Sequence, residues 1–243
     1  MSKKELSIKI DYLSIIFDNL KAEELIRKVL GLPLDYFMIQ KAKVKHKDYT
    51  NLYQFGTIKV YGDRQSKDGT SEAGCYLILS GQGCEDYYSF LQTSKHTYSD
   101  FFKICLQIVG RGNFQLTRID IAIDHRNDIP FFTVAQIKRK FLKDESVSKS
   151  KSYRFAESSF DEDIEKTVYI GDGKSNISYR FYDTDKEQAG KYQLPYEEME
   201  NWKRTELQLL DEVAHSFAML MCETLEELGN FINDNIAMYK NDI

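Results

Sequence analysis

The chain has few of the features that reveal a protein's class from sequence alone. It contains no run that approaches the roughly 20 apolar residues of a membrane-spanning helix, and the opening MSKKELSIKID has no apolar signal core. The cysteines have no C-x-x-C spacing, so neither a zinc site nor a disulfide framework is predicted for Cys75, Cys84, Cys105 and Cys222. We therefore expect a cytoplasmic protein with no membrane partner.

The signatures of several large enzyme classes are also missing. The four histidines are scattered, and no two are spaced to hold one metal ion. The turn GDGKSN (171–176) lacks the spacing of a nucleotide-binding P-loop, and no G-x-S-x-G nucleophile motif occurs. Any chemistry is therefore expected from carboxylates, arginines and tyrosines.

The composition is that of a globular protein with a proper core. The chain has 243 residues, of which 42% are hydrophobic and 29% charged. We expect a single domain over residues 1–243, with a loop break near 144–152. The net charge of -5 argues weakly against a generic nucleic-acid binder. Basic clusters at 41–47, 138–143 and 149–154 are either phosphate-binding surfaces or ordinary solvated faces.

Hydrophobic periodicity predicts strands interleaved with helices. The expected strands cover residues 7–17, 52–62, 74–81, 116–124, the two runs that flank the GDGKSN turn, and 201–210. The expected helices cover residues 22–32, 84–92, 98–110, 133–143 with Thr133 as N-cap, and about 211–239. Strands dominate the middle of the chain, which predicts an α+β fold with a mostly antiparallel central sheet and flanking helices.

One expected strand, LTRIDIAID (116–124), alternates between a mostly charged face and an apolar face. Side chains two apart share a face of a strand, so Arg118, Asp120 and Asp124 are expected to point one way and the isoleucines the other. A solvent-facing strand of an antiparallel sheet has the same pattern. Aspartate is nevertheless poorly suited to strand interiors, so two of them on one face favour a functional role.

Two further strands show a similar polar face. In WKRTELQL the alternation groups Arg204, Glu206 and Gln208, and in YRFYD it groups Arg180 with Tyr182. For one strand alone, a surface salt bridge explains the pattern. Three such strands predict a pocket suited to phosphoryl transfer: carboxylates bind Mg²⁺ or Mn²⁺, arginine neutralises a phosphate, and tyrosine attacks phosphorus.

Four segments, in this order, resemble the replication initiation factor family: DYLSIIFDN (11–19), LTRIDIAID (116–124), TVYIGDGKSNISYRFYDTDKEQ (167–188) and WKRTELQL (202–209). That family includes initiators of rolling-circle plasmid replication and relaxases of integrative conjugative elements. The resemblance implies a protein that nicks one DNA strand at an origin and stays attached to the 5′ end through a phosphotyrosine. It also implies an α+β fold related to the two-histidine rolling-circle nucleases, with carboxylates in place of the histidines.

The resemblance assigns roles to individual residues. The family's R-x-Y-[DN]-K-like motif corresponds to RFYDTDKE, which makes Tyr182 the nucleophile and leaves Thr184 where a lysine is usual. Tyr169 and Tyr179 are fallback nucleophiles. The resemblance also implies metal ligation of Mg²⁺ or Mn²⁺ by Asp120, Glu206 and Asp124, and catalytic support by Arg180 and Arg204. In addition, DNA contacts are predicted for Arg118 and Lys174 and, from the basic cluster at 138–143, for Lys138, Arg139 and Lys140.

Several alternatives stay open at this point. The protein could be a non-catalytic origin-binding protein, or a metal-dependent nuclease that uses water as nucleophile. Plasmid replication and conjugative transfer use the same nicking chemistry, and host helicase and polymerase are partners implied by the resemblance alone. Family members often carry an N-terminal helix-turn-helix, whereas this sequence begins at the first expected strand, so we expect a short initiator or the catalytic portion of a longer protein.

Overall fold

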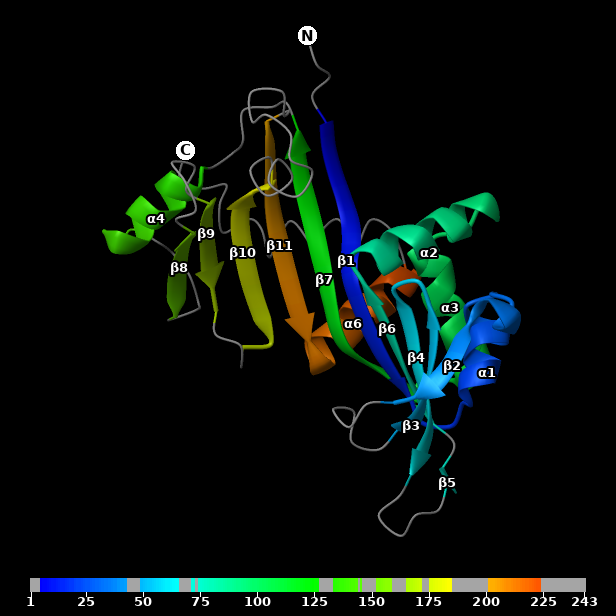
Figure 1. Cartoon of the computed structure of the whole chain (residues 1–243). Coiled ribbons are helices and arrows are strands. Elements are labelled where there is room, and N and C mark those ends of the chain that lie inside the picture. Colours follow the sequence, from blue (N-terminus) through cyan, green and yellow to red (C-terminus); the bar gives the residue numbers. More distant parts are fainter. Residues whose placement is uncertain are drawn as a thin grey trace. The chain divides into compact units, whose positions relative to one another are not determined.

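Antiparallel strands make up most of the described part of the chain. The computed structural model describes residues 5–42, 49–65, 71–72, 74–126, 133–143, 145, 152–158, 165–171, 175–184 and 201–223. The chain forms two compact units (Figure 1). Unit 1 contains residues 120–209 and the N-terminal ten residues, and unit 2 contains residues 11–119 and the segment that begins at Leu210. Strands β1 and β7 each contribute residues to both units.

Unit 2 is built on an antiparallel sheet. Its strands are β1 (Glu5–Phe17), β2 (Met38–Lys41), β3 (Tyr49–Phe55), β4 (Ile58–Gln65), β5 (Ser71–Glu72), β6 (Cys75–Ser80) and the first part of β7 (Phe114–Arg126). They are ordered β2-β3-β4-β6-β1-β7, and β5 pairs with β4. The β1–β6 register places Tyr12 opposite Ser80 and Phe17 opposite Cys75. Alternate residues of β6 are buried, so one face of this sheet belongs to the core.

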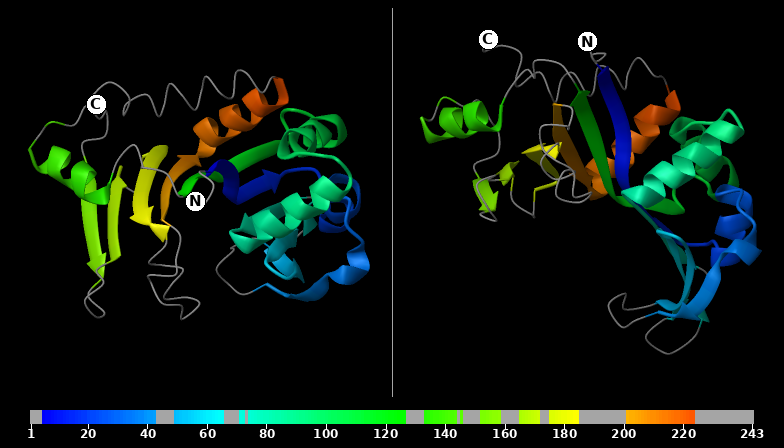
Figure 2. Two further views of the ribbon diagram at one scale, coloured as in Figure 1. Left: turned by 90° about the horizontal axis from the view of Figure 1, so that it is seen from above. Right: turned by 45° about the horizontal axis from the view of Figure 1, so that its top comes forward.

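Helices cover one face of the unit 2 sheet (Figure 2). They are α1 (Ala22–Glu24), which continues into a π-helical segment (Leu25–Val29), a 3₁₀ turn (Leu34–Tyr36), α2 (Gln82–Thr93), α3 (Tyr98–Val109) and α6 (Asp211–Glu223). A capping box formed by Thr97 and Asp100 fixes the start of α3. Phe17, Tyr87, Phe101, Phe102 and Phe217 are almost completely buried and form the centre of this core.

The strands of unit 1 belong to the same 11-stranded sheet and have one apolar and one polar face. After β7, its order is β11 (Trp202–Leu210), β10 (Ile177–Asp183), β9 (Glu165–Ile170) and β8 (Tyr153–Ser158). The helix α4 (Val134–Leu142) packs on β9 and β10 through the buried side chains of Val134, Ile137 and Phe141. Val168 and Phe181, which are opposite each other in the register, are fully buried. The polar side chains of the same strands point to the other face.

The α+β class with a mostly antiparallel sheet and flanking helices is confirmed, and Thr133 is the N-cap of α4 as predicted. The run 52–62 is two strands rather than one, because Gly56 adopts a φ of 56° and turns the chain back on itself. The predicted helix 22–32 is shorter than expected. It consists of α1 (Ala22–Glu24) and the π-helical segment that follows it directly, and it ends at Val29. Strands β2, β5 and β8 were not predicted.

The strict alternation predicted for 116–124 is wrong at its first residues. Ser14 Oγ lies 2.7 Å from Thr117 Oγ1, and the guanidinium carbon of Arg118 lies 4.3 Å from the ring centre of Tyr12. Tyr12 and Ser14 share a face of β1, so the adjacent residues Thr117 and Arg118 both point to that face, as in a β-bulge. Leu116 and Ile119 are both fully buried on either side of this step.

Some predictions fall outside what is described. The loop at 144–152 and the helix beyond residue 223 lie largely or wholly outside the described residues. The single domain over 1–243 stays a prediction. No helix in the described part of the chain is long and apolar enough to cross a membrane.

Candidate functional site

The register of β10 and β11 brings two of the predicted polar faces together. Antiparallel pairing places Ser178 opposite Gln208, Arg180 opposite Glu206 and Tyr182 opposite Arg204. Residues opposite each other in a sheet lie on the same face, so these side chains form one polar ladder. Ser178 Oγ lies 3.3 Å from Gln208 Oε1, which closes one end of the ladder. The meeting of these two polar faces, expected from the alternation, is confirmed.

Glu206 joins the tyrosine and the arginine of this ladder. The hydroxyl of Tyr182 donates a hydrogen bond to Glu206 Oε1. Arg180 Nη1 lies 3.1 Å from Glu206 Oε2, and the exposed fraction of the side chain is 41% for Arg180 and 8% for Glu206. One buried carboxylate therefore holds a phenol with one oxygen and a partly exposed cation with the other. The phenol has an acceptor for its proton, and the guanidinium is accessible to an anion.

The third polar face, that of β7, joins the ladder through a buried ion pair. Arg204 donates from Nε to Asp124 Oδ1 at 2.5 Å and from Nη2 to Oδ2 at 2.8 Å. Trp202 Nε1 donates to Asp124 Oδ1 at 2.8 Å, and Arg126 stacks on the Trp202 ring at 3.9 Å. Both oxygens of Asp124 are therefore occupied by side chains of β11. The pair ties β7 to β11, and Arg204 is the carboxylate partner that the sequence allowed.

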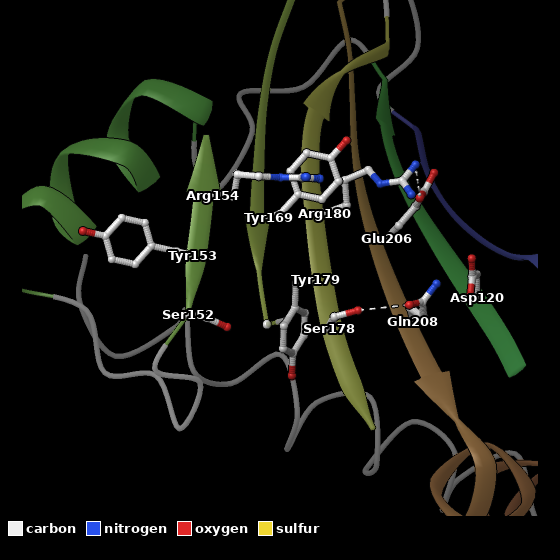
Figure 3. A pocket seen from close by; sticks show the side chains of 11 residues that line it. Asp120, Ser152, Tyr153, Arg154, Tyr169, Ser178, Tyr179, Arg180, Glu206 and Gln208 are labelled. Atoms are coloured by element: carbon white, nitrogen blue, oxygen red, sulfur yellow. Dashed lines mark hydrogen bonds and ion pairs between the residues drawn. The ribbon is translucent and has the colours of Figure 1, made fainter. Parts of the chain in front are cut away.

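Asp120 lies on the same face of β7 and is 5% exposed. Together with Glu206 it lines a cavity with a volume of about 490 Å³ (Figure 3). Among the described residues, no three His, Cys, Asp or Glu side chains are placed to hold one metal ion. The predicted ligands Asp120, Glu206 and Asp124 thus do not form one cluster, because Asp124 is engaged by Arg204 and Trp202. Two carboxylates still fit Mg²⁺, which is often held by one or two carboxylates with waters and substrate phosphates.

The far wall of the cavity contains residues that the sequence reasoning missed. The guanidinium of Arg154, on β8, lies 4.4 Å from the ring centre of Tyr169, and that of Arg180 lies 5.5 Å from the same ring (Figure 3). The registers place Arg154 opposite Tyr169 and Tyr169 opposite Arg180. The signal in the sequence was weak, since Arg154 was assigned only to the basic cluster at 149–154.

The fallback nucleophiles have different surroundings. Tyr179 is 7% exposed and alternates with Arg180, so its side chain points to the apolar face. Burial raises the pKa of the Tyr179 phenol, which disfavours the phenolate that attack on phosphorus requires. Tyr169 faces the cavity but lies between two guanidinium groups. Thr184, at the position where the family usually has lysine, is fully buried, and its hydroxyl has no hydrogen-bond partner in the described residues.

None of the predicted DNA-contacting residues is a member of the polar ladder of β10 and β11. Arg139 is exposed on α4, whereas Lys138 and Lys140 of the same helix are half-buried, with Lys138 Nζ 5.3 Å from the Phe155 ring centre. Arg118 stacks on Tyr12 in unit 2. Lys174 lies outside the described residues. Their contacts with DNA stay predictions.

Comparison with known proteins supplies independent findings. Residues 7–104 match the model of the rolling circle replication initiation protein N-terminal domain, and residues 114–242 match that of the replication initiation factor. A protein of Bacillus subtilis (strain 168), provisionally named DNA relaxase NicK, is 33% identical over 213 residues, which are 84% of this chain and 56% of that protein. The chain thus spans little more than half the length of this curated relative.

A solved structure, the rolling circle replication initiator protein from Geobacillus stearothermophilus, has a similar fold. The TM-score is 0.76 at 24% sequence identity, and the match covers 97% of this chain and 86% of the other. At this level of identity the likeness concerns the fold.

Proposed function

Because the chain belongs to the replication initiation factor family, we propose that it cuts one strand of DNA with Tyr182 as nucleophile and stays attached to the 5′ end. The observation that carries this proposal is the hydrogen bond from the Tyr182 hydroxyl to Glu206, a buried carboxylate that also pairs with Arg180. A phenol at an ordinary pKa of about 10 is a poor nucleophile until an acceptor takes its proton. Glu206 is placed to be that acceptor.

The proposed step is an in-line displacement at phosphorus. The Tyr182 oxygen forms a bond to the scissile phosphorus while its proton moves to Glu206 Oε1. The bond between phosphorus and the 3′ oxygen breaks, and that oxygen takes a proton from water. The products are a 5′ phosphotyrosine and a free 3′-OH, and the reverse step rejoins a strand. Arg180, which is partly exposed beside Glu206, neutralises the negative charge of the phosphate.

Asp120 and Glu206 are the residues that would hold Mg²⁺ or Mn²⁺ in this proposal. A divalent ion there would act as a Lewis acid on a phosphate oxygen. Asp124 enters the proposal as the anchor of Arg204 rather than as a metal ligand, because a buried guanidinium pairs with both of its oxygens. Glu206 differs, since its partners are the Tyr182 phenol and the partly exposed Arg180, which the proposed step directs to the phosphate. Arg204 in turn fixes β11 beside β7, and so helps to position Glu206.

The test is nicking of supercoiled DNA from the plasmid or conjugative element that carries the coding sequence. We expect the parent protein with Mg²⁺ to give nicked DNA and a protein–DNA adduct that survives SDS, and chelation of the metal to abolish both. Tyr182→Phe should form no adduct. The control Tyr36→Phe removes a phenol that is 59% exposed in unit 2, and it should behave as the parent does.

Each alternative gives a different result in the same assay. A nuclease that uses water would nick equally well with Tyr182→Phe and leave both ends free of protein. A non-catalytic origin-binding protein would bind the DNA and never nick it. Either result contradicts the tyrosine mechanism.

The cellular role follows from the released 3′-OH. In this proposal a host polymerase extends it and a host helicase unwinds the strand, for plasmid replication or conjugative transfer. Because its proposed substrate is the DNA of a plasmid or conjugative element, we propose that the protein acts in the cytoplasm.

A further inference from the structure

The cavity extends from Glu206 across β10 and β9 to Arg154 on β8, a residue that the proposed reaction does not use. Figure 3 shows the Arg154 side chain lying across the Tyr169 ring, while Arg180 extends toward Glu206. We call Arg154, Tyr169 and Arg180 the arginine–tyrosine clamp. It spans three neighbouring strands at one level of the sheet, because the registers place these residues opposite one another.

The two arginines of the clamp are in different states. Arg180 is paired with Glu206. Arg154 is an exposed residue whose contact is the stacking on Tyr169 at 4.4 Å, and within the described residues its guanidinium has no hydrogen bond or ion pair. Stacking uses the face of a guanidinium and leaves its N–H edges open. Arg154 is therefore held in a fixed plane, and none of its N–H donors is used by a described residue.

A planar guanidinium with open donors is suited to bidentate binding of a phosphate. The cavity beside it has about 490 Å³, within the range of small-ligand sites. Ser178 and Gln208, which are hydrogen-bonded to each other, also line the cavity and form its floor in this description. This combination of a cation, a concave space and neutral polar groups matches one nucleotide of a single strand: a phosphate at Arg154, and a sugar and base along the floor.

We propose that the arginine–tyrosine clamp binds the DNA single strand next to the cleavage point, with Arg154 holding a backbone phosphate adjacent to the scissile one. The proposal rests on the proposed function, because the scissile phosphate is placed at Tyr182, Glu206 and Arg180. Arg154 is the phosphate-binding residue. Tyr169 is a positioning residue, whose ring keeps both guanidinium groups in their planes.

The clamp makes separable predictions for substitutions. Arg154→Gln removes one phosphate contact, so the slope of log K against log salt should fall by about 0.7 for single-stranded DNA. We expect the affinity to fall about tenfold, the effect of one charge-assisted hydrogen-bonded contact. Arg154→Lys keeps the charge and should keep the slope, but it loses the planar fork and binds more weakly. Tyr169→Phe keeps the ring and should bind as the parent does, whereas Tyr169→Leu should bind more weakly.

The experiment measures binding of a short fluorescein-labelled oligo(dT) to the full chain by fluorescence anisotropy, with a metal chelator present, between about 50 and 200 mM salt. Arg27→Gln is the matched control, since Arg27 is an exposed arginine of unit 2 and its loss changes the net charge equally. Thermal melting of each variant checks that the fold is intact. A slope and affinity for Arg154→Gln equal to those of Arg27→Gln would overturn the clamp.

The clamp and the nicking proposal fail in different ways. Loss of slope with Arg154→Gln, in a protein that never forms an adduct on supercoiled DNA, supports the clamp and contradicts the nicking reaction. Adduct formation by the parent, together with an unchanged slope for Arg154→Gln, does the reverse. If Tyr169→Leu and Tyr169→Phe bind alike, the positioning role of the ring is wrong.

Discussion

The buried ion pair between Asp124 and Arg204 makes a quantitative prediction about stability. The side chains are 2% and 9% exposed, and the guanidinium donates to both carboxylate oxygens at 2.5 and 2.8 Å. Removing one partner leaves the other as an uncompensated buried charge, which costs about 3–5 kcal/mol. We therefore expect Asp124→Ala and Arg204→Ala each to lower the free energy of unfolding of unit 1 by this amount.

The double variant should behave differently from the sum of the two single variants. With both charges removed, no unpaired ion remains in the interior, so Asp124→Ala with Arg204→Ala should show a coupling energy of about 2 kcal/mol or more. Lys203 and Asp183 form a matched control on the neighbouring strands, with a 3.1 Å contact and side chains that are 15% and 18% exposed. Because this pair is more exposed than that of Asp124 and Arg204, Lys203→Ala should cost less stability than Asp124→Ala.

The assay can use the protein's single tryptophan. Trp202 donates its indole N–H to Asp124, so its fluorescence during urea unfolding reports on the strands that the ion pair joins. The free energy is obtained by linear extrapolation, with the slope compared among variants. If Asp124→Ala costs no more than Lys203→Ala, the anchoring role is refuted. If Mg²⁺ stabilises the parent but not Asp124→Ala, Asp124 returns as a metal ligand.

Two further predictions concern cysteine reactivity and the start of α4. Burial raises the pKa of the Cys75 and Cys105 thiols, so little of either thiolate forms near neutral pH. A thiol reagent should therefore modify the half-buried Cys222 first. Rapid labelling of Cys105 would contradict this prediction. Thr133 Oγ1 accepts a hydrogen bond from the Gln136 backbone N–H at 3.1 Å. Thr133→Ala should therefore lower the free energy of unfolding by about 1 kcal/mol and speed amide hydrogen exchange in α4. The control Thr93→Ala should leave hydrogen exchange in α4 unchanged.

Much of the site could be predicted from the sequence because the side-chain period of a strand is two. That period alone put Arg180 with Tyr182, and Glu206 with Arg204, on one face of their strands, and the register later brought both faces together. The family resemblance chose Tyr182 among the tyrosines, which alternation could not do. Thr133 was readable as an N-cap because its hydroxyl acts locally, three residues from its partner.

What could not be predicted depends on pairing between distant segments. Whether Asp124 faces a metal or an arginine is decided by Arg204, 80 residues later in the chain. Arg154 looked like part of a basic loop because β8 was not recognised, and only its pairing with β9 places it over Tyr169. The adjacent residues Thr117 and Arg118 point to the same face of β7. Strict alternation could not predict this, because both residues are polar and either could have been placed on the polar face.

The most direct test of the central claim is to identify the residue that carries the DNA. The parent protein is incubated with Mg²⁺ and its supercoiled DNA, the adduct is digested with protease and nuclease, and the peptide with residual nucleotide is sequenced by mass spectrometry. We predict a phosphodiester on Tyr182, within the peptide that contains β10. A nucleotide found on Tyr169 or another residue, or cleaved DNA with no attached peptide, would contradict the account.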